Sequence, residues 1–150
     1  MKHLSVLPVM RSFARTAVLL SLSLMFVACS SLIAPYNETS YRYATSLKPE
    51  ALMLMGRATE EYASHATEVD ALMLKVEQAY EYVAGLPNNE ETAKQWEILK
   101  DPDGHLLGGF MSRWKDKGKL GAALVENARE DTVGPAFDAI IALETLKIKQ

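Results

Sequence analysis

The strongest constraint on this chain is a helical repeat of apolar residues that runs from residue 43 to residue 83. Successive apolar positions are three or four residues apart, which places one continuous stripe on one face of an α-helix. The stripe comprises Tyr43, Ala44, Leu47, Ala51, Leu54, Met55, Ala58, Tyr62, His65, Val69, Leu72, Met73, Val76, Ala79, Tyr80 and Val83. No segment shows the two-residue alternation typical of a strand. The chain is therefore expected to be all-α.

The stripe allows one helix or two over residues 49–84. We favour a single long helix that starts or kinks at Pro49, because no Gly or Pro marks a turn near residue 66 and the period continues through it. The alternative is a hairpin of two helices that divides near Ala66. Thr67-Glu68-Val69-Asp70 supports it, since this pattern matches a capping box at the start of a helix.

Turn signals divide the rest of the chain into two short helices and one long one. Gly85-Leu86-Pro87-Asn88-Asn89 predicts a C-cap glycine followed by an asparagine that caps the next helix. The expected elements are helices over residues 90–99 and 105–114, a turn over 101–104, a charged loop over 115–119, and a last helix over 121–147 that Gly134-Pro135 kinks. The predicted fold is an irregular antiparallel helical bundle with long first and last helices and two short helices in the connection.

Aromatic residues at helical spacing are expected to anchor the core of this bundle. Trp96, Trp114 and Phe137 are each in register with apolar neighbours, so each should be buried. We expect the last helix to pack near the second short helix and to bury Trp114 and Phe137 there.

The first 28 residues have the three parts of a cleaved export signal. Lys2, Arg11 and Arg15 make a basic start, residues 16–27 are apolar, and Ala28 is small. Twelve apolar residues are too few to cross a bilayer, which takes about 20. Leu24-Met25-Phe26-Val27-Ala28-Cys29 resembles the lipobox of bacterial lipoproteins, in which the cysteine carries lipid. The expected organisation is a signal peptide over 1–28, a lipidated tether over 29–37 that begins at Cys29, and one helical domain over 38–150.

The lipobox resemblance implies a location and a partner. Lipid on Cys29 would hold the chain on a membrane of the bacterial cell envelope, and Ser30 after the cysteine implies the outer membrane, facing the periplasm. After residue 28 the chain has 13 basic and 19 acidic residues, a net charge of −6. This argues against nucleic acid as a partner. Cys29 is the only cysteine, so once it is acylated the chain can form no disulfide.

Three motifs partly match known kinds of chemical site. Glu61, His65 and Glu68 could share a helix face as a tuned base, but a solvated ion-pairing face explains them more simply. Asp101-Pro102-Asp103-Gly104 resembles the start of a calcium loop but lacks the acidic twelfth residue, which is Ser112. The glycines of residues 104–109 lack the Lys-Ser/Thr ending of a phosphate loop, so close helix packing explains them. No catalytic, cofactor or metal residue is predicted.

Two segments resemble parts of small helical bacterial lipoproteins without assigned function. They are Trp96-x-x-Leu99-x-Asp101-Pro102-x-Gly104-x-Leu106-Leu107-Gly108-Gly109-Phe110 and Ala136-Phe137-Asp138-x-Ile140-Ile141-x-Leu143-Glu144. The resemblance implies class and fold and brings no catalytic residues. The predicted function is a non-enzymatic helical adaptor with a protein partner in the envelope. The basic residues Arg113, Lys115, Lys117 and Lys119 could meet an anionic partner or form a solvated loop. The alternative function is binding of an apolar or acyl ligand in a pocket between helices, lined by Met53, Leu54, Met55, Leu72 and Met73.

Overall fold

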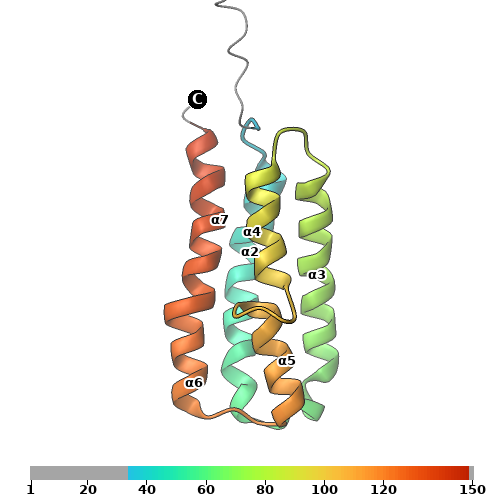
Figure 1. Ribbon diagram of the computed structural model, residues 1–150, viewed down its shortest axis with the longest axis vertical. Coiled ribbons are helices and arrows are strands. Elements are labelled where there is room, and N and C mark those ends of the chain that lie inside the picture. Colours follow the sequence, from blue (N-terminus) through green and yellow to red (C-terminus); the bar gives the residue numbers. More distant parts are fainter. Residues whose placement is uncertain (1–33, 149–150) are drawn as a thin grey trace, which may run out of the picture. The chain divides into compact units, whose positions relative to one another are not determined.

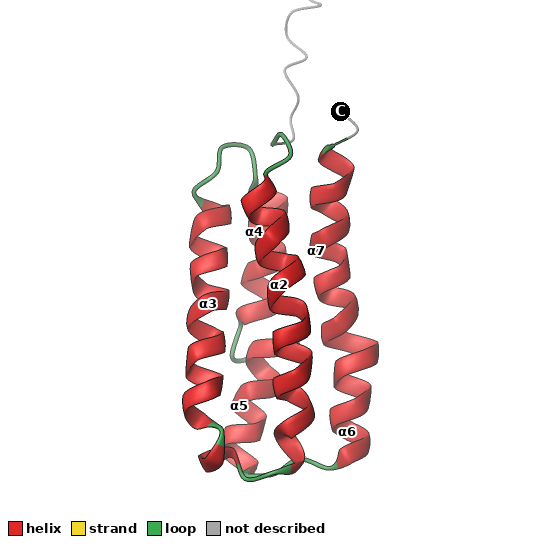
Figure 2. Ribbon diagram, turned by 180° about the vertical axis from the view of Figure 1, so that it is seen from behind, coloured by secondary structure: helices red, strands yellow, loops and turns green. Residues whose placement is uncertain are grey.

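The computed structural model describes residues 34–148, which form helices and turns and no strand. In chain order the elements are α2 (Glu38–Met55), the short 3-10 helices η2 (Gly56–Thr59) and η3 (Tyr62–Ser64), α3 (Ala66–Ala84), α4 (Glu90–Lys100), α5 (Leu107–Lys117), α6 (Ala122–Asn127), the π-helical segment η4 (Ala128–Val133) and α7 (Gly134–Lys147). The last three form one continuous helix, hereafter the last helix. Figures 1 and 2 show α2, α3, the α4–α5 pair and the last helix running side by side. The all-α bundle predicted from the sequence is confirmed.

The prediction of one long helix over residues 49–84 is wrong. The chain leaves α2 after Met55, turns through η2 and η3, and returns as α3. Glu60 and Glu61 between these turns are extended (ψ 169° and 127°), which ends the helix. We refer to residues 56–65 as the corner. The apolar period continues through the corner because Ala58 is still fully buried and Tyr62 packs on the core.

Tertiary hydrogen bonds hold the corner in place of helical ones. The amide of Leu120 donates to the carbonyl of Ala58 at 2.8 Å, and the amide of Tyr62 donates to the carbonyl of Gly118 at 2.8 Å. The indole Nε1 of Trp114 donates to the carbonyl of Glu60 at 3.1 Å. The corner therefore depends on residues 114–120, which the spacing of the apolar residues does not indicate.

The ends of the first helices differ from the prediction in detail. Helix α2 begins at Glu38, where the Asn37 side chain accepts a hydrogen bond from the Ser40 amide at 3.0 Å. Pro49 lies inside α2 on its exposed side, so the backbone hydrogen bond that it removes is at the solvent face. Helix α3 begins at Ala66, as the hairpin alternative required, although His65 rather than Thr67 occupies the N-cap position.

The core follows the predicted stripe and adds three aromatic anchors. The buried members of the stripe are Ala44, Leu47, Ala51, Leu54, Met55, Ala58, Val69, Leu72, Val76, Ala79 and Val83. Trp96, Trp114 and Phe137 are fully buried, as predicted. Their pairing differs from the expectation, because Phe137 packs on Trp96 of α4 whereas Trp114 of α5 packs on Tyr62 and His65 at the corner.

The two short helices are joined by a very close turn. Asp101 accepts the amides of Asp103 (through Oδ1, 3.0 Å) and Gly104 (through its carbonyl, 3.1 Å), so residues 101–104 form the predicted turn. A Cβ atom on Gly108 would lie 2.2 Å from the carbonyl oxygen of Lys100, and one on Gly109 would lie 1.9 Å from that of Gly104. Only glycine permits this approach. The interpretation of these glycines as packing residues is confirmed.

Two later boundaries differ from the prediction. Lys115 and Lys117 belong to α5 and not to a loop, and α5 ends at Gly118, whose positive φ of 74° favours glycine. The irregularity expected at Gly134-Pro135 takes the form of the π-helical segment η4 just before it. Pro135 has no N–H and its ring crowds the preceding turn, so a widened turn accommodates it. Among residues 34–148, no helix combines the length and apolar character required to cross a membrane.

Candidate functional site

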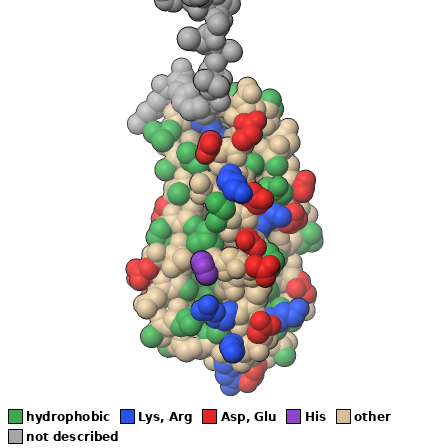
Figure 3. Space-filling view, in the orientation of Figure 1, with side chains coloured by type: hydrophobic (Ala, Val, Ile, Leu, Met, Phe, Trp, Pro, Cys, Tyr) green, Lys and Arg blue, Asp and Glu red, His purple; other side chains and the backbone are tan. Residues whose placement is uncertain are grey.

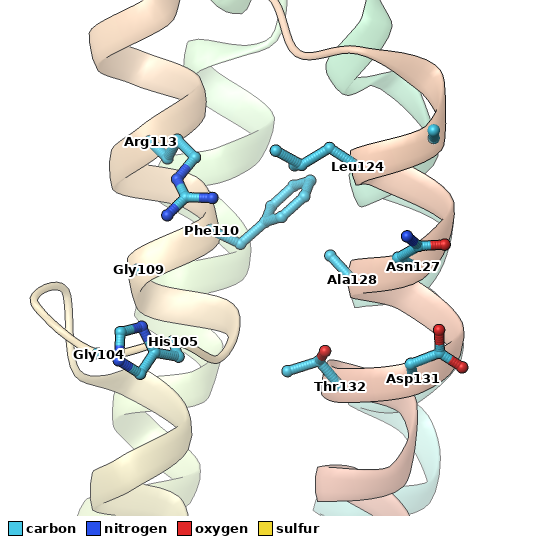
Figure 4. Close-up of a pocket in the computed structure, with 11 residues that line it drawn as sticks. Gly104, His105, Gly109, Phe110, Arg113, Leu124, Asn127, Ala128, Asp131 and Thr132 are labelled. Atoms are coloured by element: carbon cyan, nitrogen blue, oxygen red, sulfur yellow. The ribbon is translucent and has the colours of Figure 1, made fainter.

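One candidate site in the described part of the chain is a groove between α5 and the last helix. Its volume is about 570 Å³, within the ~300–1,000 Å³ range of small-molecule sites. It is lined by Gly104, His105, Gly109, Phe110, Arg113, Ala123, Leu124, Asn127, Ala128, Asp131 and Thr132. Figure 4 shows Phe110 and Leu124 pointing toward each other across the gap, with Ala128 and Thr132 on the same wall as Leu124.

The groove exists because the short helices pack on different neighbours. Helix α4 packs against α7 through Trp96 and Phe137, which closes that half of the bundle. Helix α5 packs instead against α3 and the corner, where Trp114 is held by Tyr62 and Glu60. The close turn over residues 101–104 separates the two helices. The last helix therefore runs past α5 without filling the space beside it.

Polar groups on both walls of the groove have no partner within the described residues. The side chains of His105, Arg113, Asn127 and Asp131 are exposed and take part in no hydrogen bond or ion pair there. Several other charged side chains are paired, as in Lys48–Asp138, Lys75–Glu50, Lys100–Glu77 and Arg129–Glu126, but unpaired ones such as Lys115 and Glu130 are also common in the described part of the chain. Figure 4 shows the Asn127 and Asp131 side chains projecting from the last helix away from α5, whereas Ala128 and Thr132 point toward α5.

The other wall is shaped by η4. The amide of Gly134 donates to the carbonyl of Arg129, which is a π-type hydrogen bond. The Nε of Arg129 donates to the carbonyl of Leu52, near the end of α2, at 2.8 Å. This bond ties the widened turn to α2. Segments of π-helix frequently occur at functional sites. Sequence analysis assigned Arg113 to a basic cluster and did not group it with residues of the last helix.

His65 is surrounded by a different pair of carboxylates from the predicted one. Its Nδ1 and Nε2 lie 3.0 Å from Glu68 and 3.0 Å from Glu60, whereas Glu61 pairs with Lys119 at 3.1 Å. The reason is the corner, because the chain between residues 60 and 66 is not the continuous helix that would have aligned Glu61 with His65. The imidazole is also not on a solvated face, since its side chain is 13 % exposed and its ring centroid lies 5.6 Å from that of Trp114, with the ring planes tilted at 37°.

The two carboxylates favour the charged form of His65. The hydrogen bond with Glu68, followed by that with Glu60, raises the pKa of His65 above its ordinary value of 6.5. The hydrogen bond with His65, followed by that with Arg57, lowers the pKa of Glu60. Both imidazole nitrogens are occupied, so His65 has no free nitrogen to offer a substrate. The arrangement stabilises the corner and is poorly suited to proton transfer.

The residues of the basic cluster predicted around 113–119 have different surroundings. Arg113 lines the groove, while Lys119 pairs with Glu61 at the corner. Lys115 and Lys117 are exposed on the last turn of α5. Figure 3 shows basic and acidic side chains interspersed over one face of the molecule.

The methionines do not line a shared apolar pocket. Met55 and Leu72 are packed in the core, and Leu54 is 7 % exposed, whereas Met53 is 68 % exposed. A second open groove of about 530 Å³ contains Met53 and Leu54, but charged Glu50, Arg57 and Glu68 also line it. This arrangement does not favour the acyl-ligand alternative.

Sequence analysis missed a buried polar cluster at the end of α7. Lys147 Nζ donates to Glu144 Oε1 at 2.6 Å, Asn89 Oδ1 at 2.6 Å and Thr92 Oγ1 at 3.0 Å. The Glu144 and Lys147 side chains are 0 % and 5 % exposed. Asn89 also donates to the carbonyl of Val83 at 3.0 Å, so it links α3, α4 and α7 and does not cap α4 with its side chain. The spacing of Glu144 and Lys147 by three residues was the available signal.

Cys29, the predicted lipidation site, lies outside the described residues. Within residues 34–148, no group of three or more His, Cys, Asp or Glu side chains is arranged to hold a metal ion. Comparisons with protein-family models, with curated proteins and with solved structures found no match to this chain. The candidate sites therefore have to be interpreted from their own geometry.

Proposed function

We propose that this protein is a lipid-anchored lipoprotein of the bacterial cell envelope that acts as a non-enzymatic helical adaptor. The observation that carries the proposal is the lipobox-like sequence before Cys29 followed closely by the start of the bundle. The Ala34 amide donates to the carbonyl of Asn88 at 2.9 Å, and Ala34 is only 4 % exposed. Five residues after Cys29 the chain is already part of the fold.

The short tether limits how far the domain can act from its anchor. Five residues span at most ~17 Å when fully extended. A lipid on Cys29 would keep the bundle beside the membrane surface. Serine at residue 30 favours the outer membrane, with the domain facing the periplasm. Such a domain suits an adaptor that engages a partner close to that membrane.

The side chains support an adaptor over an enzyme. His65, which hydrogen-bonds two carboxylates, has both ring nitrogens engaged at the corner. The Lys147–Glu144 pair is enclosed by Asn89 and Thr92 and has no access to a substrate. The open groove beside Arg113 and Asp131 offers contacts for a partner but no activated nucleophile.

Metabolic labelling with a clickable palmitate in a bacterial host tests the anchor. The wild-type chain should take up the label, and Cys29→Ala should lose it and accumulate as a longer precursor. Cys29→Ser serves as the closest steric control and should also be unlabelled. Equal labelling of Cys29→Ala and wild type would rule out lipidation at this cysteine.

A further inference from the structure

The end of the bundle that the tether joins is built from uncharged segments. We call this end the tip; its three segments are residues 34–37, 85–89 and 146–148. Hydrogen bonds join them, because the Ala34 amide donates to the carbonyl of Asn88 at 2.9 Å and Lys147 Nζ donates to Asn89 Oδ1 at 2.6 Å. Figure 1 shows the start of α2, the α3–α4 loop and the C-terminal end of α7 at the same end of the bundle. Lys147 is the only Asp, Glu, Lys or Arg in these segments, and its side chain is 5 % exposed.

The tip exposes apolar side chains instead. Of the seven large apolar side chains that are exposed among residues 34–148, three belong to the tip, namely Tyr36, Leu146 and Ile148. Pro35 and Pro87 are exposed there as well. The tip therefore presents an apolar surface that no described residue covers.

Exposed apolar side chains elsewhere lie among charges. Met53 shares its groove with Glu50, Arg57 and Glu68. Ile98 lies beside three charged residues of α4, which are Lys94, Glu97 and Lys100. The combination of exposed apolar side chains with uncharged surroundings thus distinguishes the tip from these two places.

The opposite end of the bundle is highly charged. It comprises the corner and residues 115–119, and its exposed charged side chains are Arg57, Glu60, Glu61, Lys115, Asp116, Lys117 and Lys119. Figure 3 shows basic and acidic side chains gathered at that lower end. The 19 residues of α3 run between the two ends, which corresponds to about 28 Å along the helix axis.

The tether attaches at the tip and is fixed to it. The Asn37 Oδ1 atom accepts hydrogen bonds from the Ser40 amide at 3.0 Å and from the Tyr82 hydroxyl at 3.2 Å. Only five residues separate Cys29 from Ala34, a reach of at most ~17 Å. A lipid on Cys29 would therefore bring the tip to the bilayer, and the charged end would point away from it.

From these observations we infer that the tip docks on the surface of a lipid bilayer, with the helices directed away from it; the inference rests on the proposed lipid anchor. Tyr36 lies at the level of the headgroups, where tyrosine rings are favoured. Leu146 and Ile148 lie against the boundary with the acyl chains. The lipid is zwitterionic, because the exposed carboxylates beside the tip, Glu38, Glu90 and Glu91, oppose an anionic surface.

Tryptophan emission in vesicles measures which end meets the lipid. The lipoprotein is purified from a bacterial host and reconstituted in phosphatidylcholine vesicles, either plain or brominated near the glycerol end of the acyl chains, since bromine quenches tryptophan on contact. Tyr36→Trp should lose emission in the brominated vesicles. Met53→Trp is the matched control, because Met53 is 68 % exposed near the other end of α2, and it should keep its emission. The wild-type chain gives the background of the buried Trp96 and Trp114.

Charges placed on the tip should lift it from the bilayer. In the Tyr36→Trp protein, the added changes Leu146→Glu and Ile148→Glu should restore the emission. Leu74→Glu is the control, because Leu74 is 60 % exposed on α3 away from the tip, and quenching should persist. All three positions are exposed, so the fold should be retained, which circular dichroism checks. Anionic phosphatidylglycerol added to the vesicles should not increase the quenching.

Intact mass measurement separates this inference from the proposed function. A purified chain without lipid on Cys29 would refute the lipoprotein proposal, and the same comparison would then be made after coupling Cys29, the only cysteine, to a maleimide lipid in the vesicles. Tip docking is overturned if Tyr36→Trp keeps its emission, which is the result when a second copy or another protein covers the tip. Equal quenching of Tyr36→Trp and Met53→Trp, or stronger quenching of Met53→Trp, would also overturn it.

Discussion

The rings of Trp96 on α4 and Phe137 on α7 meet edge to face, with centroids 6.1 Å apart and planes at 88°. Both side chains are fully buried. An edge-to-face contact is a favoured geometry for aromatic pairs and adds to the free energy gained from burial. This pair joins the last helix to α4, in the half of the bundle that the groove does not occupy.

Phe137→Ala should lower the free energy of unfolding by about 3–5 kcal/mol, a large share of the ~5–15 kcal/mol typical of a domain. The reason is a cavity against Trp96, with loss of the edge-to-face contact. Thermal unfolding followed by circular dichroism measures it. Ile98→Ala on α4 is the control, because Ile98 is 43 % exposed and its loss should cost little. Equal melting temperatures for the two variants would contradict the packing described here.

Lys147→Met should also destabilise the fold by about 3–5 kcal/mol, because it leaves the buried Glu144 carboxylate without its ion pair. The second oxygen, Glu144 Oε2, already has no partner within the described residues. The double variant Lys147→Met/Glu144→Leu should recover part of the loss, although Asn89 and Thr92 would still lack their donor. Urea unfolding gives the free energies.

The exposed pair Lys94–Glu97 provides the control for that experiment. Its side chains are 61 % and 52 % exposed, so Lys94→Met should lower the free energy of unfolding far less than Lys147→Met does. A loss as small as this in Lys147→Met would show that the buried pair does not stabilise the junction of α3, α4 and α7.

Gly108→Ala should destabilise the bundle by at least ~1–3 kcal/mol, because the added Cβ would lie 2.2 Å from the backbone carbonyl of Lys100. The backbone cannot move away without separating α4 from α5. Gly121→Ala is the matched control, since an added Cβ there meets no atom within 4 Å. Melting temperatures of the two variants should differ clearly, and a neutral Gly108→Ala would be inconsistent with the close turn.

The stability of the protein should depend on pH through His65. Hydrogen bonds with Glu68 and Glu60 raise the pKa of His65 in the folded state above its ordinary value of 6.5, so the folded chain holds the proton more tightly than the unfolded chain. This contribution is fully present below about pH 6.5 and is lost as the pH rises through the folded-state pKa. The melting temperature should therefore fall as the pH rises from about 6.5 through the folded-state pKa of His65.

His65→Gln should remove this part of the pH dependence, and His105→Gln, on an exposed residue outside the corner, should retain it. Melting curves at half-unit steps from pH 5.5 to 8.5 would compare the three proteins. Identical pH profiles for wild type and His65→Gln would show that the carboxylates do not stabilise the imidazolium.

Much of the local structure could be predicted from the sequence. The three- and four-residue spacing identified which residues would be buried, since the same face of a helix must cover the core whichever partner it meets. Gly85 and the turn over 101–104 indicated where α3 and α4 end, and the glycines at 108 and 109 indicated a close approach, because only a residue without a Cβ fits beside the carbonyls of Lys100 and Gly104. The export and lipidation signals of residues 1–29 remain predictions from sequence.

The tertiary structure decided features that the spacing of the apolar residues does not specify. The corner interrupts a continuous apolar period because distant groups satisfy its backbone, namely the amide of Leu120, the carbonyl of Gly118 and the indole of Trp114. The same bonds draw α5 toward the corner and open the groove beside the last helix. They bring Glu60 rather than Glu61 to His65. Periodicity reports only which side of a helix is apolar, whereas the place where a helix ends and which helices meet depend on contacts between residues far apart in the chain.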